Sequence, residues 1–526
     1  MTEPAQAAAT IAAGYAFSST ALELGTVSVD GQVTADAKVR IPLSMMNRHG
    51  LVAGATGTGK TKTLQLIAEQ LSGNGVPVIM ADIKGDLSGL RNPGESNDRI
   101  TARAAQTGDD WAATAYPVEF VSLGDKGIGV PIRATITSFG PILLAKVLGL
   151  NETQESVLGL IFHWADQKGL PLLDLKDLRS VIAYLTSDEG KPELKAIGGV
   201  STQTAGVILR ALTNLAAAGG DTFFGEPEIE PADLLRVGAD GRGIVTLFEL
   251  GDQAARPALF STFLMWILAD LFEFLPEVGD LDKPKLVFIF DESHLLFDGA
   301  SKAFKDQVVQ TVKLIRSKGV GVFFCSQLPT DIPNEVLSQL GARIQHALRA
   351  FTPDDQKALT KTVKTYPISD VYKLDQALTS LGTGEAIVTV LSERGAPTPV
   401  AWTVIRAPRS SMQAVGSAGI TAAAKASPLY AKYGQAIDRE SAYEKLAAKA
   451  LAPGESPDAP APVPAPAPKR APAPKRAPAP KPAKEEPSMI TEVLTSKPMQ
   501  SFLRSAATAA GREFSRAIFG TGRRRR

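Results

Sequence analysis

The sequence predicts an α/β fold with a doubly wound, mainly parallel sheet, and three observations support this prediction. Short β-rich runs alternate with helical patterns between residues 40 and 410, as they do in βαβ units. Several of these runs are apolar throughout, which is typical of parallel strands that helices cover on both faces. Between residues 133 and 240 the strand signals give way to leucine-rich helical spacing, which predicts an all-helical insertion.

Eight short runs are the predicted strands of this sheet. In chain order they cover residues 51–53, 76–81, 118–123, 244–250, 286–290, 320–326, 343–348 and 386–391. Helical spacing in the insertion is clearest at residues 142–150, 158–164 and 207–215. The longest apolar stretch, residues 258–276, contains Asp270 and Glu273, so we expect a buried helix there and no transmembrane segment.

The composition of the 526-residue chain excludes several classes of protein. With 44% hydrophobic and 21% charged residues, most of the chain can bury a core. Its 56 basic and 55 acidic side chains nearly balance, which excludes a histone-like or wholly disordered polyelectrolyte. The single cysteine, Cys325, lies in an apolar run and is expected in the core, and no Cys/His cluster has zinc-ligand spacing. The N-terminus lacks the basic start of a signal peptide, so we expect a cytoplasmic protein.

The C-terminal part of the chain differs from the rest. Residues 451–487 hold thirteen of the 36 prolines in a Pro-Ala-Lys/Arg pattern that cannot form a core, so we expect a disordered linker. Residues 488–526 hold eight basic and two acidic side chains, and their apolar residues mostly fall three or four apart, which predicts a basic amphipathic helix. These apolar positions are Phe502, Leu503, Ala506, Ala510, Phe514 and Ile518.

Two roles for this tail helix stay open. Its apolar stripe could dock on the globular part of the same chain, or the helix could bind a protein partner, an anionic membrane surface or nucleic acid. The whole chain carries +1, the linker +2 and the tail +6, so residues 1–450 carry −7. Nucleic acid would therefore need a local basic surface on the globular part.

A glycine-rich loop follows the first predicted strand. Residues 54–61 read Gly-Ala-Thr-Gly-Thr-Gly-Lys-Thr and match G-x-x-x-x-G-K-[ST] between an apolar run and a helical pattern. Its glycines let backbone N–H groups converge on phosphate oxygens, and the helix N-terminus adds its positive end. We expect Lys60 to reach the β- and γ-phosphates of ATP and the Thr61 hydroxyl to bind Mg²⁺. The predicted nucleotide-binding residues are Gly54, Ala55, Thr56, Gly57, Thr58, Gly59, Lys60, Thr61 and Lys62.

An acid pair ends the predicted strand 286–290. Acids at the carboxyl end of a parallel strand point into the crevice where ligands bind. We expect Asp291 to hold Mg²⁺, through water, and Glu292 to accept the proton of the attacking water. The next strand ends at Gln327, whose amide could sense the γ-phosphate and orient that water, and a plain turn role is the alternative.

Several other charged residues are weaker candidates for the same chemistry. Arg343 opens a predicted strand and could reach the γ-phosphate of a neighbouring subunit as a trans arginine finger, whereas a surface salt bridge is the alternative. Arg316 and Arg349 are further candidates for this role. Asp82 and Asp86 follow the second strand, where contact with nucleotide or Mg²⁺ and a turn role are equally open. The predicted catalytic residues are Glu292, Gln327, Arg343 and Lys60.

These motifs resemble, in their order, the HerA/FtsK branch of P-loop ATPases, and more closely its HerA-like, YjgR-like members. The segments GATGTGKT, ADIKGDLSGL, FIFDESHLLF, FFCSQ and ARIQHALRAFTP carry the resemblance over roughly residues 40–410. It implies a P-loop NTPase fold of the RecA/ASCE type and a hexameric ring that pumps double-stranded DNA. By the same resemblance Glu292 would be the base, Gln327 the sensor and Arg343 the trans finger.

The sequence departs from the family pattern at two places. HerA has a β-barrel domain before its phosphate loop, and only about 50 residues precede the loop here. Many relatives read TQRP or SQRP where this chain has Ser-Gln-Leu-Pro at residues 326–329. Composition and resemblance together divide the chain into an N-terminal extension, an ATPase core in two parts, a helical insertion, a helical extension, a linker and a tail helix. Their boundaries are 1–40, 41–132 with 241–410, 133–240, 411–450, 451–487 and 488–526.

Three functional hypotheses follow. The leading one is a Mg²⁺-dependent ATPase that forms a homo-oligomeric ring and translocates double-stranded DNA, with Lys302 and Lys305 of a loop at 297–305 neutralising phosphates. For this stretch a solvated loop is the alternative. The second hypothesis is an ATPase motor or assembly factor for protein or membrane partners that the basic tail recruits. The third is a nucleotide-binding scaffold with slow or no turnover.

Overall fold

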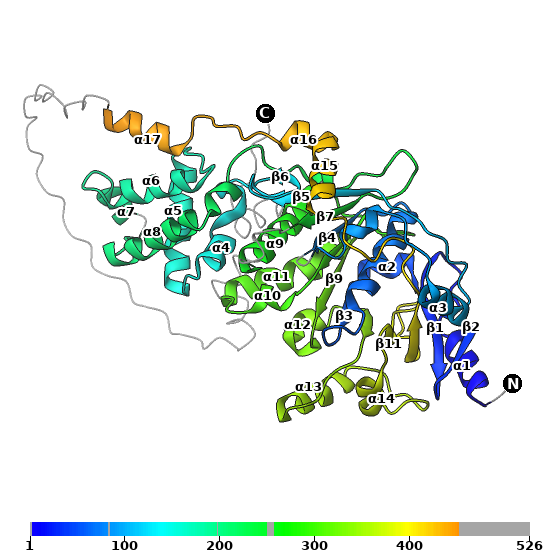
Figure 1. The fold of residues 1–526 in the computed structure, drawn as a ribbon. Coiled ribbons are helices and arrows are strands. Elements are labelled where there is room, and N and C mark those ends of the chain that lie inside the picture. The colour runs from blue at the N-terminus through cyan, green and yellow to red at the C-terminus, as the bar shows by residue number, and fades with distance from the viewer. Residues whose placement is uncertain (1–2, 83–84, 197, 250–256, 452–526) are drawn as a thin grey trace, which may run out of the picture.

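The computed structural model describes residues 3–82, 85–196, 198–249 and 257–451, which form one twelve-stranded sheet with helices on both faces (Figure 1). The strand order is β2-β1-β12-β11-β10-β3-β9-β8-β4-β7-β5-β6. The predicted tail helix and nearly all of the predicted linker lie outside the described residues.

The eight neighbouring strands from β10 to β6 run parallel. They are β10 (Ala342–Gln345), β3 (Gly50–Ala53), β9 (Val320–Ser326), β8 (Leu286–Phe290), β4 (Val78–Asp82), β7 (Val245–Glu249), β5 (Val118–Leu123) and β6 (Val130–Ile132). Seven of them are predicted strands, and the eighth predicted strand, β11 (Glu385–Thr389), pairs antiparallel with β10. The predicted α/β fold with a mainly parallel sheet is confirmed.

An antiparallel edge completes the sheet. β12 (Ala401–Ile405) pairs with β11, and β1 (Ala21–Val29) joins β12 to β2 (Gln32–Pro42). Residues 1–40, expected as an N-terminal extension, therefore supply one strand and most of a second to the same sheet, together with helix α1 (Glu3–Ala13). The β1–β2 turn has Asp30 and Gly31 at positive φ, 48° and 75°, and an Asp-Gly pair is a strong hairpin signal in a sequence.

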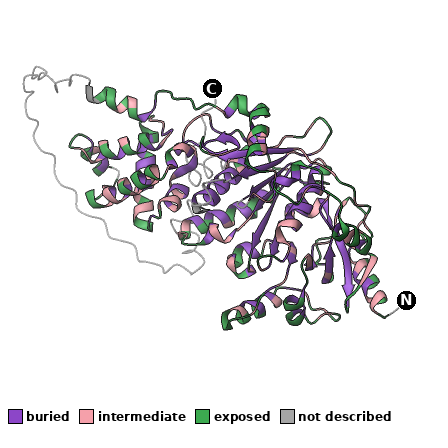
Figure 2. Ribbon diagram, viewed as in Figure 1, coloured by how far each residue is buried: buried purple, intermediate pink, exposed green. Residues whose placement is uncertain are grey.

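Successive residues of the central strands pack into two different cores, one on each face of the sheet. In β8, Phe288 and Phe290 join the core on the face of the helical insertion, whereas Val287 and Ile289 join the core on the opposite face. Figure 2 shows the central strands, such as β8 and β9, buried along their length while the helices expose their outer sides. Burial on both faces explains why most side chains of these strands are apolar and why β8 is apolar at every position.

Helices cover the sheet on both faces. α2 (Lys60–Gly73) packs on the core shared with α1, while α9 (Pro257–Phe274) and α11 (Lys302–Ile315) pack on the other. In the described ranges, no helix combines the length and apolarity that crossing a membrane requires, and the apolar stretch at 258–276 is the buried helix α9. The remaining helices of this part are α3 (Asp98–Thr107), α10 (His294–Phe297), α12 (Asn334–Leu337), α13 (Pro353–Val363) and α14 (Leu374–Ser380).

The predicted insertion is a cluster of helices beside α9 (Figure 1). Its helices are α4 (Ile136–Leu148), α5 (Glu152–Gln167), α6 (Leu175–Thr186), α7 (Lys191–Ala196) and α8 (Thr202–Ala217). Asn151 and Asp174 begin α5 and α6 with capping boxes, so the sequence sets these helix starts locally. After β12 the chain returns through α15 (Ser417–Ala426), α16 (Pro428–Tyr433) and α17 (Ala442–Leu451), and Lys176 of α6 pairs with Glu444 of α17 at 3.1 Å.

Candidate nucleotide site

The phosphate loop connects β3 to α2 at the carboxyl edge of the parallel strands. Gly54, Gly57 and Gly59 have φ values of 151°, 81° and 115°, a region that side chains other than glycine rarely adopt. A Cβ on Gly54 would lie 2.6 Å from Cβ of His346, so the loop needs glycine there for space as well as for conformation. The predicted loop thus has the backbone that a phosphate cradle requires.

Lys60 is the first residue of α2, and its side chain reaches back over the loop. Its Nζ donates to the carbonyl oxygens of Gly54, at 2.6 Å, and Ala55, at 3.2 Å. Thr61 follows in the first helical turn. The amine therefore lies across the same loop whose N–H groups would receive phosphate, at the positive end of the α2 dipole.

Lys62 points in another direction. Its Nζ donates to the carbonyl oxygens of Met412, at 3.0 Å, and Asp86, at 3.4 Å, and to the side chain of Gln65. Burial lowers the pKa of Lys62, although Asp86, Asp82 and Glu69 oppose this shift. The amine is held by groups away from the phosphate loop. Any contact of Lys62 with nucleotide would therefore be through its backbone N–H.

The acid pair lies at the same edge of the sheet. β8 is separated from β3 by β9 alone, and the three strands are parallel, so Asp291 and Glu292 emerge beside the phosphate loop. The Glu292 backbone N–H donates to Oδ1 of Asp291 at 2.9 Å. Glu292 has a φ of 46°, and a residue other than glycine in this region stores strain of about 1–3 kcal/mol, which is most common at functional sites.

Gln327 follows β9, between the acid pair and the phosphate loop, and its side chain is exposed. The turn after it is fixed by Asp331, whose carboxylate accepts from the Ser326 hydroxyl at 2.5 Å and from the Leu328 N–H at 3.0 Å. A fixed turn holds the backbone of Gln327 still while its amide remains free to meet a ligand.

Asp82 has a turn role. Its carboxylate accepts the backbone N–H groups of Asp86, Leu87 and Ser88, at 3.1, 2.8 and 3.1 Å, and so anchors the backbone of residues 86–88 at the end of β4. Burial raises its pKa to about 6. Glu249, the last residue of β7, is the register partner of Asp82 and is also buried, which raises its pKa to about 8. Glu249 was not among the residues predicted for the site, although it ends an apolar strand just as Asp291 follows one.

The candidate arginine fingers lie at two different edges. Arg343, at the start of β10, donates to the carbonyl oxygens of Leu337, at 3.2 Å, and Thr365, at 3.4 Å. Together with Arg48 and Arg316 it lines a cavity of about 500 Å³ at the amino edge of the parallel strands, opposite the phosphate loop. Burial lowers the pKa of Arg343, and burial and the neighbouring Arg48 lower that of Arg316. No acidic side chain is among the described residues that line this cavity.

Arg349 lies at the other end of the same strand. It is exposed, and its Nη2 approaches the carbonyl oxygen of Thr56 in the phosphate loop at 3.4 Å. Arg349 therefore contacts the phosphate loop of its own chain, whereas Arg316 and Arg343 lie at the opposite edge of the sheet.

The loop expected at 297–305 is shorter than predicted, and the expectation of Lys302 and Lys305 in a loop is wrong. Both are on α11, whose first turn the Ser301 hydroxyl caps by accepting the Phe304 N–H. Serine is a favoured N-cap residue, and the sequence prediction overlooked this signal at Ser301. Lys305 lines a groove of about 740 Å³, together with His294 and Lys361.

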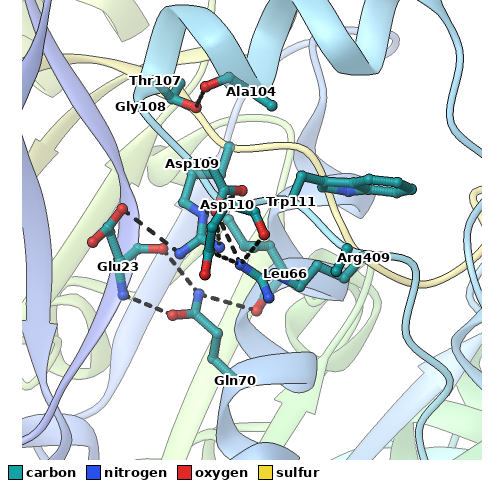
Figure 3. Close-up of polar contacts among 12 residues, drawn as sticks. Glu23, Leu66, Gln70, Ala104, Thr107, Gly108, Asp109, Asp110, Trp111 and Arg409 are labelled. Carbon is teal, nitrogen blue, oxygen red and sulfur yellow. Dashed lines mark hydrogen bonds and ion pairs between the residues drawn. The ribbon is translucent and has the colours of Figure 1, made fainter.

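An ion-pair network fastens the back of α2 to the segment after β12, and Figure 3 shows the part of it around Asp109 and Arg409. Arg406 binds Asp109 through two hydrogen bonds of 3.0 and 2.8 Å, and Arg409 binds the same carboxylate at 3.0 Å. The buried Glu69 of α2 accepts the backbone N–H groups of Arg409 and Ser410 at 2.9 and 2.8 Å. The network joins α2, α3 and the β12 end into one support for the phosphate loop.

A glycine loop on a helix N-terminus, with an acid pair at the end of a neighbouring parallel strand, defines a protein of the P-loop nucleotide-binding class. The chain belongs to the helicase HerA-like C-terminal family, whose pattern matches residues 28–526. The HerA-like resemblance is thereby confirmed, and it supports an ATPase.

Individual relatives agree with the family. The DNA double-strand break repair helicase HerA of Sulfurisphaera tokodaii is 26% identical over 379 residues, covering 70% of this chain and 68% of its own length. The protein of the same name from Sulfolobus acidocaldarius is 22% identical over 382 residues, again covering 70% and 68%. Among solved structures, the bacterial conjugative coupling protein TrwB has a TM-score of 0.49 and 13% identity, covering 76% of this chain and 93% of its own.

Proposed function

We propose that this chain binds ATP with Mg²⁺ on the phosphate loop and hydrolyses it. The observation that supports this most is that Lys60, Asp291 and Glu292 lie at the same edge of the sheet, after two parallel strands that only β9 separates. Thr61 and Asp291 offer a hydroxyl and a carboxylate oxygen, the hard ligands that Mg²⁺ prefers, so they fit this ion. When bound, Mg²⁺ would neutralise charge on the β- and γ-phosphates.

Glu292, Lys60 and Gln327 have different roles in the proposed hydrolysis. Glu292 accepts a proton from a water molecule, whose oxygen forms a bond to the γ-phosphorus as the bond from that phosphorus to the β–γ bridging oxygen breaks. ADP leaves with the bridging oxygen, and Lys60 balances the charge that develops there. Gln327, between the loop and the acid pair, orients the water through its amide.

We further propose a ring in which neighbours complete each other's sites. The phosphate loop and the arginines of the cavity, Arg48, Arg316 and Arg343, lie at opposite edges of the sheet. In a head-to-tail contact one subunit's arginines face the next subunit's loop, and such contacts close into rings. An arginine cluster with no acidic side chain among its described lining residues suits the γ-phosphate of a neighbour. A hexamer is the expected closure.

The proposed substrate of this motor is double-stranded DNA, because the relatives described above are helicases of double-strand break repair. Lys305 and Lys361 line the groove of about 740 Å³ beside α11. They could contact DNA phosphates, and such contacts do not depend on base sequence. The second candidate is a motor for a protein or membrane partner. The charge of −7 on residues 1–450 against +6 on residues 488–526 favours it, since the tail is the most basic part of the chain.

Steady-state phosphate release tests the proposed function. The purified chain is assayed with and without long double-stranded DNA over a salt series, with E292Q as the blank. Stimulation that fades as salt rises supports a DNA motor, since phosphate contacts weaken steeply with salt. Turnover that is indifferent to DNA at low salt supports the partner motor, and deletion of residues 488–526 should then abolish recruitment of that partner. Release equal to the E292Q blank contradicts the ATPase itself.

A further inference from the structure

We infer that His346 is a positioning residue that holds the phosphate loop in its nucleotide-binding shape and ties it to the β10–β11 arm. The β10–β11 arm is defined here as residues 346–384, which connect β10 to β11 and carry α13 and α14. This inference rests on the proposed function in one respect, that residues 54–61 bind nucleotide. Two hydrogen bonds, two close glycine contacts and the ends of the arm support it.

The His346 ring forms two hydrogen bonds, which determine the ring nitrogen that carries the hydrogen. Its Nδ1 lies 2.8 Å from the carbonyl oxygen of Glu385, and its Nε2 lies 3.0 Å from Oγ1 of Thr63. A carbonyl oxygen can only accept, so Nδ1 carries the hydrogen. Burial and the nearby charge of Lys60 lower the pKa of His346 to about 4, so the ring is neutral near pH 7. Nε2 therefore accepts, and the Thr63 hydroxyl donates.

The ring spans two elements that are far apart in the sequence. Thr63 lies on α2, two residues after the predicted Mg²⁺ ligand Thr61, and Glu385 begins β11 at the far end of the arm. His346 and Thr63 are both buried, with exposed fractions of 0% and 1%. An apolar side chain in place of the ring would leave a buried hydroxyl and a partly buried carbonyl without this partner, at a cost in free energy.

The phosphate loop is shaped around this ring. Cβ of His346 is the atom that a side chain at Gly54 would meet at 2.6 Å, and its Cε1 lies 3.6 Å from where a Cβ on Gly59 would be. The glycines at the two ends of the loop therefore approach one imidazole. A histidine buried only to fill the core would have no reason to bond both the loop helix and the arm.

Both ends of the arm also bind the loop through the backbone. The Ala55 N–H donates to the carbonyl oxygen of Ala347 at 2.8 Å, and the Gly384 N–H donates to that of Thr58 at 2.9 Å. A change in the loop must therefore move both ends of the arm together. The arm exposes Phe351 and Ile368, 85% and 97% accessible, on its outer surface. Coupling of this kind is reciprocal, so a partner that displaces the arm would change nucleotide affinity.

Paired amide substitutions test the inference. H346Q places an amide near Nε2 and can keep the Thr63 bond, whereas H346N reaches only the Nδ1 position and keeps the Glu385 bond. We measure the Kd of a fluorescent ATP analogue together with KM and kcat for ATP, and thermal melting of each full-length variant. H346N and H346A should raise Kd and KM about tenfold, while kcat at saturating ATP stays within about threefold. H346Q should recover Kd to within about threefold of the wild type.

Substitutions at Thr63 provide the second arm of the test. T63V removes the hydroxyl donor and should raise Kd as H346N does, whereas T63S retains it and should not. If the histidine variants do not fold, the T63V and T63S pair decides. Equal Kd values for wild type, H346A and T63V would overturn the inference while leaving the ATPase intact. A wild-type chain that does not bind the analogue would instead contradict the proposed function.

Discussion

Nδ1 of His294 lies 3.5 Å from Oε2 of Glu292, the proposed base. His294 also lines the groove that Lys305 and Lys361 line, so one side chain lies beside both the proposed base and the groove proposed to contact DNA. Glu292 is at a strained φ and is 16% exposed, and a neighbouring ring restricts where its carboxylate can point.

Removal of the His294 ring should slow the chemical step. H294A should lower kcat by about tenfold with KM for ATP nearly unchanged, because the base loses its orientation while the phosphate loop is untouched. Steady-state kinetics with and without DNA measure this. The control is H163A, since His163 is an exposed residue of α5 that pairs with Gln167. Equal kcat values for wild type and H294A would show that the contact is incidental.

A methyl group at Gly54 should weaken nucleotide binding strongly. G54A combines a φ of 151° with a contact of 2.6 Å to His346, so the loop must shift to accept it. We expect the Kd for ATP to rise by roughly two orders of magnitude, measured by fluorescence titration. G73A is the matched control at the end of α2, where a Cβ meets nothing within 4 Å and φ is ordinary. ATP binding by G54A at wild-type affinity would contradict the described loop geometry.

Mixing two inactive variants should restore turnover if the arginine cluster acts on a neighbour. R316A and R343A should each lower kcat by about 10³-fold, as loss of an arginine finger does. E292Q is inactive for a different reason, so mixed rings contain some contacts with an intact base and an intact arginine. Recovered activity in the mixture supports the trans role. The Arg349 guanidinium contacts the phosphate loop of its own chain, so a mixture of R349A and E292Q should not exceed the residual rate of R349A. Recovery in that mixture would show that Arg349, and not Arg316 or Arg343, acts on the neighbouring subunit.

The ion-pair network behind α2 should contribute substantially to stability. The Asp109 and Arg406 side chains are 2% and 10% exposed, so D109A leaves a buried guanidinium without its main partner. Loss of one member of such a pair costs about 3–5 kcal/mol in free energy of unfolding, which denaturant titration measures. The control D188A breaks a pair with Lys191 whose carboxylate is 98% exposed, and it should leave the melting temperature unchanged.

Stability should fall as the pH rises from about 7 to 8, because of Glu249. Burial raises the pKa of this carboxyl from 4.5 to about 8, so in this range the unfolded chain has released the proton and the folded chain still holds it. The loss should be roughly 1 kcal/mol per pH unit until the folded pKa is passed. The buried His49 and His346, whose pKa values burial lowers to about 4, act below this range and in the opposite sense. E249Q should have a flat profile, and a slope equal to the wild-type slope would assign the effect elsewhere.

The part of the fold that could be predicted from the sequence is the part where a local pattern has one physical meaning. Apolar runs such as residues 286–290 must be strands covered on both faces, and they are. β1 and β2 at the sheet edge are different, because one face is partly exposed and residues such as Glu23 and Lys38 interrupt the apolar pattern. Their Asp-Gly turn at residues 30–31 was the signal available.

The candidate site also has a part that could be predicted from the sequence and a part that could not. The phosphate loop and the acid pair are contiguous motifs, so the sequence shows them directly. His346, Glu249 and Arg48 matter only through neighbours that the fold brings to them, and no spacing along the chain relates His346 to Thr63. Arg343, Arg316 and Arg349 illustrate this limit. Only the parallel sheet shows that the first two lie at one edge and the third at the other.

The most direct test of the central claim compares binding and turnover in two variants. K60A should lose both the binding of a fluorescent ATP analogue and phosphate release, because it removes the charge that meets the phosphates. E292Q should bind the analogue with a Kd within about threefold of the wild type and release phosphate at least about 10²-fold more slowly, because only the base is missing. Phosphate release by E292Q at the wild-type rate would contradict the account of this site.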